Sequence, residues 1–371
     1  MLRLLEFTCS QPHSGEVYSC AYTPDGDHVL SGGWDGQLRL WDAVDGECRL
    51  SLPASPKPIS ACARSPDGTQ WLVGSMEGLL TIWDAVSQYQ LTSFVAHTRP
   101  ISAITFSPDG QLFATSSWDR VVSIRKVGRE REGRNLALHT DIVAGCQFTT
   151  DGRYLLSWSY DGTIKVWDIA LAHEVATLCG HTDRVITLSL SPDGLYALSG
   201  GRDGTIRLWD LEKFTEVGTV NLGAEVRVCF YLLDGESIVV GDAIGRLFLM
   251  ALPSFEVQAQ MQVPFRALCG DMKPAGDQVA LGAEDGRVYF VALDGYDLAS
   301  LVVTPREDLK PEANLFDRFF GKTRMTRVFK CTCPSCRQTV ELASIPAQPV
   351  HCPSCHRSLR ISSRVAQLQP N

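Results

Sequence analysis

The sequence predicts an all-β fold built from seven copies of one four-stranded antiparallel unit. First, a turn position held by Asp in six copies and by Ala in the last returns every 41 or 42 residues, from Asp25 to Ala275. Second, each copy holds alternating runs rich in Val, Ile, Leu and aromatic residues, separated by Asp-Gly turns that favour tight hairpins. Because one such sheet cannot bury both of its faces, neighbouring units must stack around an axis.

The first copy shows the elements of one unit. Its alternating runs predict four strands, at residues 17–22, 28–31, 37–41 and 47–52. Two segments compete to complete the last sheet, residues 2–7 and residues 298–303. The N-terminal segment is favoured, because pairing the two ends of the repeat region locks the ring.

A Trp-Asp pair ends four of the copies, as at Trp41-Asp42 and Trp209-Asp210, and Gly180-His181 stands near the start of the fifth. A period of about 40 to 45 residues with these two markers resembles the WD-repeat β-propeller family. The resemblance covers residues 1–303 and implies a seven-bladed propeller in which each copy supplies one blade.

In that family each well-formed blade carries a hydrogen-bonded set of His, Ser or Thr, Asp and Trp. The resemblance implies complete sets in the first, fourth and fifth copies: His13, Ser31, Asp35 and Trp41; His139, Ser157, Asp161 and Trp167; His181, Ser199, Asp203 and Trp209. Because the set recurs in register and lacks a nucleophile, we interpret it as structural and not as a catalytic relay.

The other copies depart from this set. The third has the first three members, at His97, Thr115 and Asp119, but Arg125 and Lys126 replace its Trp-Asp pair. The second keeps only its tryptophan, Trp83, and has Val73 and Glu77 at the Ser and Asp positions. The sixth and seventh copies rest on hydrophobic alternation and period alone.

Composition predicts an ordinary soluble protein of the cytoplasm. The chain has 371 residues, of which 44% are hydrophobic and 20% charged, enough for a sizeable core. No segment approaches the roughly 18 apolar residues of a membrane span, and the N-terminus does not read as a secretory signal. Four of the 13 cysteines, Cys20, Cys62, Cys146 and Cys229, share one first-strand position, which predicts core packing by free thiols.

Four further cysteines predict one structural Zn²⁺ ion. They form two Cys-Pro-Ser-Cys turns separated by fifteen residues and comprise Cys333, Cys336, Cys352 and Cys355. Two Cys-x-x-Cys turns at this spacing present four thiolates, which close a tetrahedral shell and leave no position for water. Cys331, His351 and His356 remain alternative ligands.

Residues 327–363 around these turns alternate like short strands and resemble a zinc ribbon, followed by a tail at 364–371. So small a module has little core, so metal binding should be inseparable from its folding. Residues 304–326 form the expected linker. It is either a flexible tether or a short amphipathic helix that presents Leu315, Phe316, Phe319 and Phe320 on one side.

Charge is unevenly distributed. Residues 305–371 hold 11 Lys and Arg against 5 Asp and Glu, whereas residues 1–304 hold 23 against 37. The basic segment raises the alternative of a factor that binds nucleic acid or the ribosome through the linker and ribbon. The acidic propeller argues against it, because it would repel phosphates.

The resemblance implies that the turn between the second and third strands opens on one face, the top face, in every blade. The residue before the turn Asp points outward there, and the resulting candidate partner-binding residues are Trp34, Trp118, Tyr160 and Arg202, with Arg184 on an adjoining loop. Trp, Tyr and Arg dominate interface hot spots.

The sequence carries no phosphate-binding Gly-rich motif, nucleophile elbow or metalloprotease helix. We therefore expect a non-enzymatic scaffold or adaptor that binds a protein or peptide on the top face, with no small-molecule substrate and no membrane. From resemblance alone, a sensor subunit of a multi-protein ATPase or signalling system is a further alternative.

Overall fold

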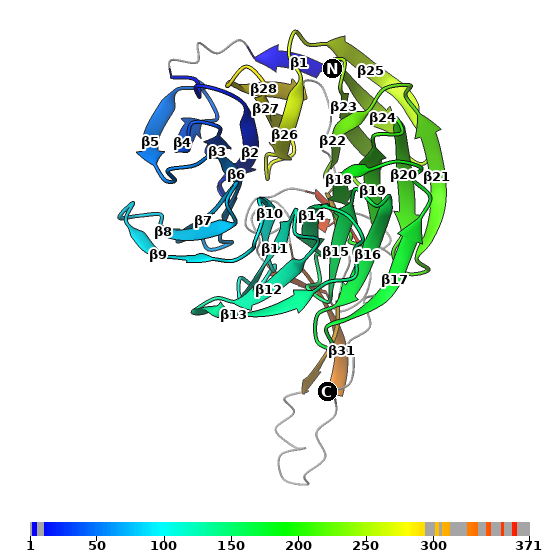
Figure 1. The fold of residues 1–371 in the computed structure, drawn as a ribbon. Coiled ribbons are helices and arrows are strands. Elements are labelled where there is room, and N and C mark those ends of the chain that lie inside the picture. The colour runs from blue at the N-terminus through cyan, green and yellow to red at the C-terminus, as the bar shows by residue number, and fades with distance from the viewer. Residues whose placement is uncertain are drawn as a thin grey trace. The chain divides into compact units, whose positions relative to one another are not determined.

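The computed structural model describes residues 2–5 and 11–293 and, beyond residue 300, six further strands. Residues 2–5 and 11–293 form seven four-stranded antiparallel sheets, which stand as blades around a central axis (Figure 1). The predicted seven-bladed, all-β propeller is therefore confirmed.

In each blade the strands follow one another from the axis outward. The first blade contains β2 (Val17–Tyr22), β3 (His28–Gly33), β4 (Gln37–Asp42) and β5 (Cys48–Pro53). The second contains β6 (Ile59–Arg64), β7 (Gln70–Ser75), β8 (Leu79–Asp84) and β9 (Gln90–Val95). The third contains β10 (Ile101–Phe106), β11 (Leu112–Ser117), β12 (Val122–Lys126) and β13 (Arg129–Leu136). The fourth contains β14 (Val143–Phe148), β15 (Tyr154–Ser159), β16 (Thr163–Asp168) and β17 (His173–Cys179).

The last three blades repeat this order with one exception. The fifth contains β18 (Val185–Leu190), β19 (Tyr196–Gly201), β20 (Thr205–Asp210) and β21 (Thr215–Asn221). The sixth contains β22 (Val226–Tyr231), β23 (Ser237–Asp242), β24 (Arg246–Ala251) and β25 (Glu256–Gln262). The seventh contains β26 (Ala267–Met272), β27 (Gln278–Ala283), β28 (Val288–Leu293) and, as its outer strand, the N-terminal β1 (Leu2–Leu5).

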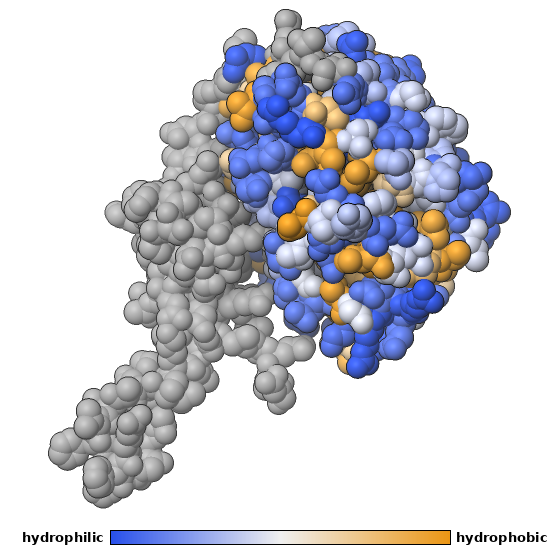
Figure 2. Space-filling model, turned by 90° about the vertical axis from the view of Figure 1, so that its left-hand side faces the viewer, coloured by the Kyte–Doolittle hydropathy of each residue, from blue (hydrophilic) through white to orange (hydrophobic). Residues whose placement is uncertain are grey.

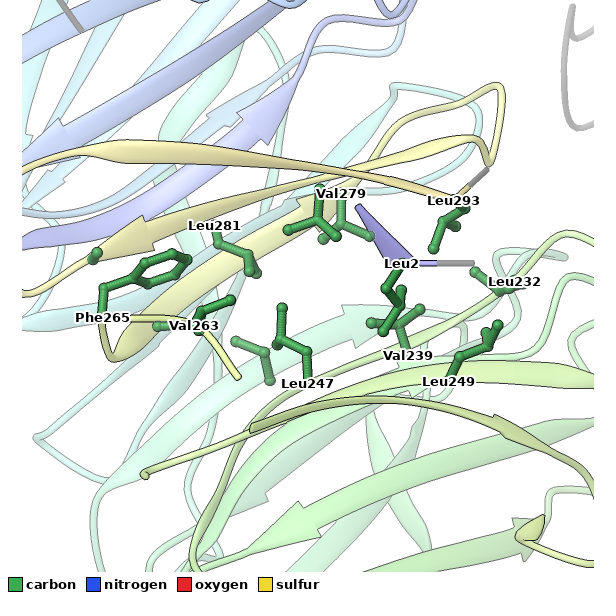
Figure 3. Packing of buried hydrophobic residues seen from close by; sticks show 14 residues of the cluster. Leu2, Leu232, Val239, Leu247, Leu249, Val263, Phe265, Val279, Leu281 and Leu293 are labelled. Carbon is green, nitrogen blue, oxygen red and sulfur yellow. The ribbon is translucent and has the colours of Figure 1, made fainter. Parts of the chain in front are cut away.

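The N-terminal strand closes the ring, as the sequence favoured. β1 runs antiparallel to β28, with Leu2 opposite Leu293. Figure 3 shows Leu2 between the sixth blade, at Val239 and Leu249, and Leu293 of the seventh. The competing segment holds β29 (Leu301–Val303), which pairs in parallel with β34 (Ser358–Ile361) in a separate sheet.

The hydrophobic core lies between the blades. Among the described residues it forms clusters that each join the facing sides of two neighbouring blades, one cluster at every junction. Between the first and second blades, for example, Leu30 and Leu38 pack with Ile59 and Trp71. Burial of a large apolar side chain contributes about 1.5–3 kcal/mol, so these junctions hold the ring together.

The chain divides near residue 296 into two compact units, and the second is described here by itself. Its strands form two three-stranded sheets, one of which holds β30 (Arg306–Pro311), β31 (Met325–Thr332) and β32 (Thr339–Leu342). The other holds β29, β34 and β33 (Val350–His351). Strand β30 lies within the expected linker; the segment proposed as a helix and the tail at 364–371 lie outside the described residues.

The surface and the cysteines fit this architecture. Cys20, Cys62, Cys146 and Cys229 are buried free thiols in the core, as predicted. Figure 2 shows the side of the propeller that lies at the left of Figure 1, where small hydrophobic groups are interrupted by polar residues. None of the described residues belongs to a helix long and apolar enough to cross a membrane.

Candidate functional site

The complete signature sets link the strands of three blades. In the first blade, His13 Nε2 lies 2.8 Å from Ser31 Oγ, and His13 Nδ1 lies 2.8 Å from Asp35 Oδ1. Trp41 Nε1 donates to the same Ser31 oxygen at 2.7 Å. The fourth and fifth blades repeat these contacts at 2.8–3.2 Å through His139, Ser157, Asp161 and Trp167 and through His181, Ser199, Asp203 and Trp209.

The electrostatics of these sets favour a structural role. Burial lowers the pKa of His13 and of His181, which keeps both rings neutral at pH 7. Burial alone would raise the pKa of Asp35, but hydrogen bonds from His13 and Arg39 hold it well below its usual range. Because the buried Ser31 hydroxyl is shared between an imidazole and an indole, it is not placed to attack a substrate.

The second and third blades depart from this set as the sequence predicts. Among the described residues, the indole nitrogen of Trp83 has no hydrogen-bond partner. In the third blade, Arg125 occupies the tryptophan position and donates to the carbonyl oxygens of Glu130 at 2.8 Å and Ala96 at 3.3 Å. Its guanidinium also lies 5.2 Å from the ring centre of Phe94, and burial lowers its pKa.

A repeated backbone contact assembles the top face. One residue in every blade directly precedes the Asp position of the turn between the second and third strands. Its main-chain N–H donates to the carbonyl of the residue that precedes the first strand, at 2.8–3.3 Å. The donor and acceptor pairs are Trp34 and Glu16, Met76 and Pro58, Trp118 and Pro100, Tyr160 and Ile142, Arg202 and Arg184, Ala243 and Glu225, and Glu284 and Arg266. The five candidate residues therefore share this end of the propeller.

The candidates differ in accessibility. Trp34 is 55% exposed and Trp118 is 40% exposed. Tyr160 is half-buried, and the guanidinium of Arg184 lies 4.5 Å from its ring centre. Arg202 is exposed, with Nε 3.9 Å from a carboxylate oxygen of Asp183. The two tryptophans are the most accessible aromatic groups of the face, and the Arg184–Tyr160 pair provides a preformed cation–π contact beside them.

Two small cavities lie away from the candidate residues. One, of about 260 Å³, is lined by Phe94 of β9 and by residues 128–132 of the third blade. The other, of about 250 Å³, lies between the turns of the second and third blades around Asp67 and Asp109. None of the candidate partner-binding residues lines either cavity.

Three features of the structure were not anticipated from the sequence. Arg120 stands at a turn position that holds Gly in the other blades, a signal visible in the repeat alignment. Asp271 interrupts a hydrophobic strand, which also marks it as unusual. The thiols of Cys20 and Cys269 lie 3.6 Å apart, and no sequence spacing relates them.

The predicted zinc ligands, Cys333, Cys336, Cys352 and Cys355, lie outside the described residues. Their chain positions are bracketed by described strands. The first pair follows β31 and precedes its antiparallel partner β32, and the second pair follows β33 and precedes its antiparallel partner β34. Within the described part of the chain, no group of three or more His, Cys, Asp or Glu residues is arranged to hold a metal ion.

Comparison with known families agrees with this geometry. The WD domain, G-beta repeat family matches five segments that together make up just over half of the chain: residues 5–42, 46–84, 88–125, 131–168 and 172–210. The matches end at the signature tryptophan position of each copy, held by Arg125 in the third, or one residue after it. The sixth and seventh copies, which keep only hydrophobic alternation, lie beyond the matched segments.

Individual proteins show more limited likeness. The Periodic tryptophan protein 2 homolog of Dictyostelium discoideum is 33% identical over 51 residues, which cover 14% of this chain and only 6% of that protein. A solved structure of U3-55K matches with a TM-score of 0.71 and 19% identity, over 79% of this chain and 98% of that chain. At this identity the likeness to U3-55K concerns the fold alone.

Proposed function

Because this chain belongs to the WD domain, G-beta repeat family, we propose that it is a non-enzymatic scaffold whose propeller binds a protein or peptide partner on its top face. The carrying observation is that Trp34, Trp118, Tyr160 and Arg202 occupy one equivalent position in four blades. These residue types combine large apolar area with a polar group and dominate interface hot spots. The repeated main-chain hydrogen bond fixes the backbone at each of these positions, which limits the conformational entropy lost on binding.

The opposite end of the propeller has a different surface. The large hydrophobic side chains that its turns between the third and fourth strands expose are mainly aliphatic, such as Val44, Val86 and Leu171, together with Tyr89. Polar residues such as Asp45 and Lys213 are exposed beside them. The exposed tryptophans of the described residues, in contrast, lie on the top face. This asymmetry supports the top face as the docking surface and supplies Tyr89 as an exposed aromatic control.

We further propose that the C-terminal module holds one structural Zn²⁺ through Cys333, Cys336, Cys352 and Cys355. The donor set consists of four thiolates, which suits tetrahedral zinc and leaves no open coordination position. Each Cys-Pro-Ser-Cys turn joins two strands of one antiparallel pair, as a pair of zinc knuckles requires. Bound zinc would stabilise the module, which would provide a second contact for the partner. The buried free thiols of the propeller suit a reducing compartment such as the cytoplasm.

Partner binding is tested by affinity capture with the full-length protein followed by mass spectrometry. The double variant Trp34→Ala/Trp118→Ala should capture at least tenfold less of the specific partner than the wild type, and Tyr89→Ala should capture as much as the wild type. All three proteins should unfold within about 2 °C of one another, because the substituted side chains are exposed. Equal capture by the double variant and the wild type would refute the docking surface.

Zinc binding is tested separately by metal analysis of freshly reduced full-length protein. We expect about one equivalent, lost in Cys333→Ser/Cys336→Ser and kept in the control Cys179→Ser, which alters an exposed thiol of the propeller. Clearly less than one equivalent in the wild type would contradict the proposal. Substitution of Cys331, His351 or His356 would identify any replacement ligand.

Nucleic-acid binding is the second candidate, because residues 305–371 hold 11 Lys and Arg against 5 Asp and Glu. Binding of the full-length protein to single-stranded RNA at rising salt distinguishes the two functions. A steep loss of affinity with salt, removed by Arg324→Glu/Arg327→Glu, would favour the nucleic-acid function. Weak binding that these substitutions do not change would favour the scaffold.

A further inference from the structure

We propose that the part of the partner that docks on the third blade is an acidic peptide segment, whose carboxylates bind Arg99 and Arg120 and whose apolar groups pack on Trp118. This inference rests on the proposed scaffold function and specifies the chemistry of the partner. It is carried by the charges of the top face, by the backbone conformation of Arg120 and by the exposure of Trp118.

Four cations on the neighbouring parts of the top face have carboxylate partners. Lys57 Nζ lies 2.9 Å from Glu77, and Arg227 Nε lies 3.3 Å from Glu225. Looser pairs at 3.9 Å join Arg202 to Asp183 and Arg266 to Glu284. These four cations are thus balanced locally, whereas Arg184 of the fifth blade lies over the ring of Tyr160.

The third blade lacks this balance. Arg99 and Arg120 are exposed, and within the described part of the chain neither forms an ion pair. The carboxylate next to Arg120, Asp119, is already engaged by His97 Nδ1 at 3.0 Å and by the N–H of Thr98 at 3.1 Å. Two guanidinium groups at this blade therefore remain available to an external acid, which they can bind bidentately.

Arg120 replaces the glycine that the other blades have at this turn. Its φ is 73°, and the equivalent residues of the other six blades are glycines with φ between 70° and 85°: Gly36, Gly78, Gly162, Gly204, Gly245 and Gly286. A side chain in this left-handed region is strained, and such strain concentrates at ligand-binding positions. Gln88, Ala172, Phe214 and Phe255 also have positive φ, at turns between third and fourth strands, so the conformation alone does not identify a site. It does allow Arg120→Gly to relieve the strain and remove the cation in one substitution.

Trp118 completes the proposed subsite. Its N–H donates to the carbonyl of Pro100 at 3.0 Å, which places its backbone beside that of Arg99. The indole is 40% exposed and precedes Asp119 and Arg120 in the same turn. A short segment with acidic and apolar residues would thus meet two cations and one aromatic surface together.

A peptide fits this face better than a nucleic acid. Residues 1–304 hold 23 Lys and Arg against 37 Asp and Glu, and Glu16, Asp183 and Glu284 surround the same top face. A continuous phosphate backbone that crosses the face would meet this repulsion. Acidic side chains can instead be confined to the third blade.

The test selects a random 12-residue peptide display library on the immobilised full-length protein. Peptides that bind the wild type but not the Trp118→Ala variant should be enriched in Asp and Glu at least twofold over the library. Affinities of the selected peptides are then measured by fluorescence polarisation. The charge reversal Arg99→Glu/Arg120→Glu should weaken binding more than tenfold, and the matched reversal Arg129→Glu/Arg131→Glu, on outer strand β13 of the same blade, should change it less than twofold.

Arg120→Gly provides the sharpest variant, because fold and function should respond in opposite directions. It restores the residue of the other blades and should raise the unfolding midpoint by about 2 °C, while it weakens peptide binding at least threefold. Unchanged peptide affinity in this variant and in the charge reversal would overturn the inference.

The outcomes also distinguish this inference from the proposed function. Selected peptides that depend on Trp118 but are neutral or basic would leave the docking surface standing and overturn the acidic partner. Failure to select any peptide that depends on Trp34 or Trp118 would overturn both. A single-stranded RNA 20-mer that binds more tightly than the peptides, with the same loss on charge reversal, would replace the peptide by a nucleic acid.

Discussion

The main-chain N–H of Tyr22 on β2 donates a 2.8 Å hydrogen bond to a carboxylate oxygen of Asp271 on β26, across the junction between the first and last blades. The other carboxylate oxygen accepts from the N–H of Met272 at 2.9 Å. In the fifth blade the equivalent position is held by Ser189, which accepts at 3.0 Å from Tyr231. Asp271, which can become charged, thus stands at the junction that closes the ring, whereas the uncharged Ser189 makes the equivalent contact between the fifth and sixth blades.

This contact predicts a stability that depends on pH. Burial raises the pKa of Asp271 from 3.8 to about 6, and within the described residues no cation pairs with it. The folded protein holds the proton of Asp271 more tightly than the unfolded chain does. Protonation of Asp271 therefore stabilises the folded state fully below about pH 4, and this contribution is lost as the pH rises through about 6. Relative to the wild type, Asp271→Asn should therefore gain about 1–2 kcal/mol of unfolding free energy between pH 4 and pH 7.5. A cost that does not depend on pH adds to this gain, because the amide has one acceptor oxygen for the two main-chain N–H donors.

Urea unfolding of the wild type and of Asp271→Asn between pH 4 and 8 measures this difference. Asp25→Asn, at an exposed turn, serves as the control for loss of one carboxylate; its pKa is lowered, so its pH dependence should have the opposite sign. A difference between Asp271→Asn and the wild type that stays constant with pH would contradict the prediction.

The N-terminal strand should be essential to the closed ring. Leu2 is 6% exposed and packs with buried residues of the sixth and seventh blades (Figure 3). Leu2→Asp should lower the free energy of unfolding by about 3 kcal/mol, because it places an unpaired charge in this cluster. Thermal unfolding followed by circular dichroism measures the effect. Val44→Asp, at a 76% exposed position, should have almost none, and equal effects of the two substitutions would count against closure by β1.

The signature tryptophans should differ in their contribution to stability. Trp167 donates to Ser157 at 2.8 Å, whereas within the described part of the chain the indole nitrogen of Trp83 has no partner. Trp167→Phe should cost about 1–2 kcal/mol more than Trp83→Phe, because only the first breaks a buried hydrogen bond. Denaturant unfolding of both variants tests this order, and a larger cost for Trp83→Phe would reverse the interpretation.

The paired thiols predict a specific response to peroxide. Cys20 Sγ lies 3.6 Å from Cys269 Sγ, and a hydrogen bond to Cys269, followed by burial, raises the pKa of Cys20. The half-buried Cys269 should react first: its thiolate takes oxygen from hydrogen peroxide to form a sulfenic acid, and Cys20 then displaces water. Two thiols and one peroxide thus yield one disulfide and two waters.

Mass spectrometry of unreduced peptides should detect this Cys20–Cys269 link after slow oxidation. The link should raise the unfolding midpoint, because it fastens the first blade covalently to the last and restricts the unfolded chain. Cys146, which has the position of Cys20 in the fourth blade, supplies the control Cys146→Ala, and this variant should still form the link. Absence of the link in protein whose other thiols are oxidised would contradict the prediction.

Local patterns in the sequence determined most of the fold. The period from Asp25 to Ala275, the strand alternation and the sets such as His13, Ser31, Asp35 and Trp41 predict the blades, because each unit is stabilised by contacts within about 40 residues. The resemblance to the WD-repeat family implied that Trp34, Trp118, Tyr160, Arg184 and Arg202 share one face, and the main-chain contacts place them there.

Ring closure decided what those patterns left open. Only the closed ring places β1 against β28, Tyr22 against Asp271 and Cys20 against Cys269, because these partners are about 250 or more residues apart and no local periodicity relates them. The free charge of Arg99 and Arg120 likewise depends on which neighbouring carboxylates are already engaged, as Asp119 is by His97. Hydrophobic alternation and turns encode a sheet locally, whereas the pairing of distant groups depends on how all seven sheets pack together.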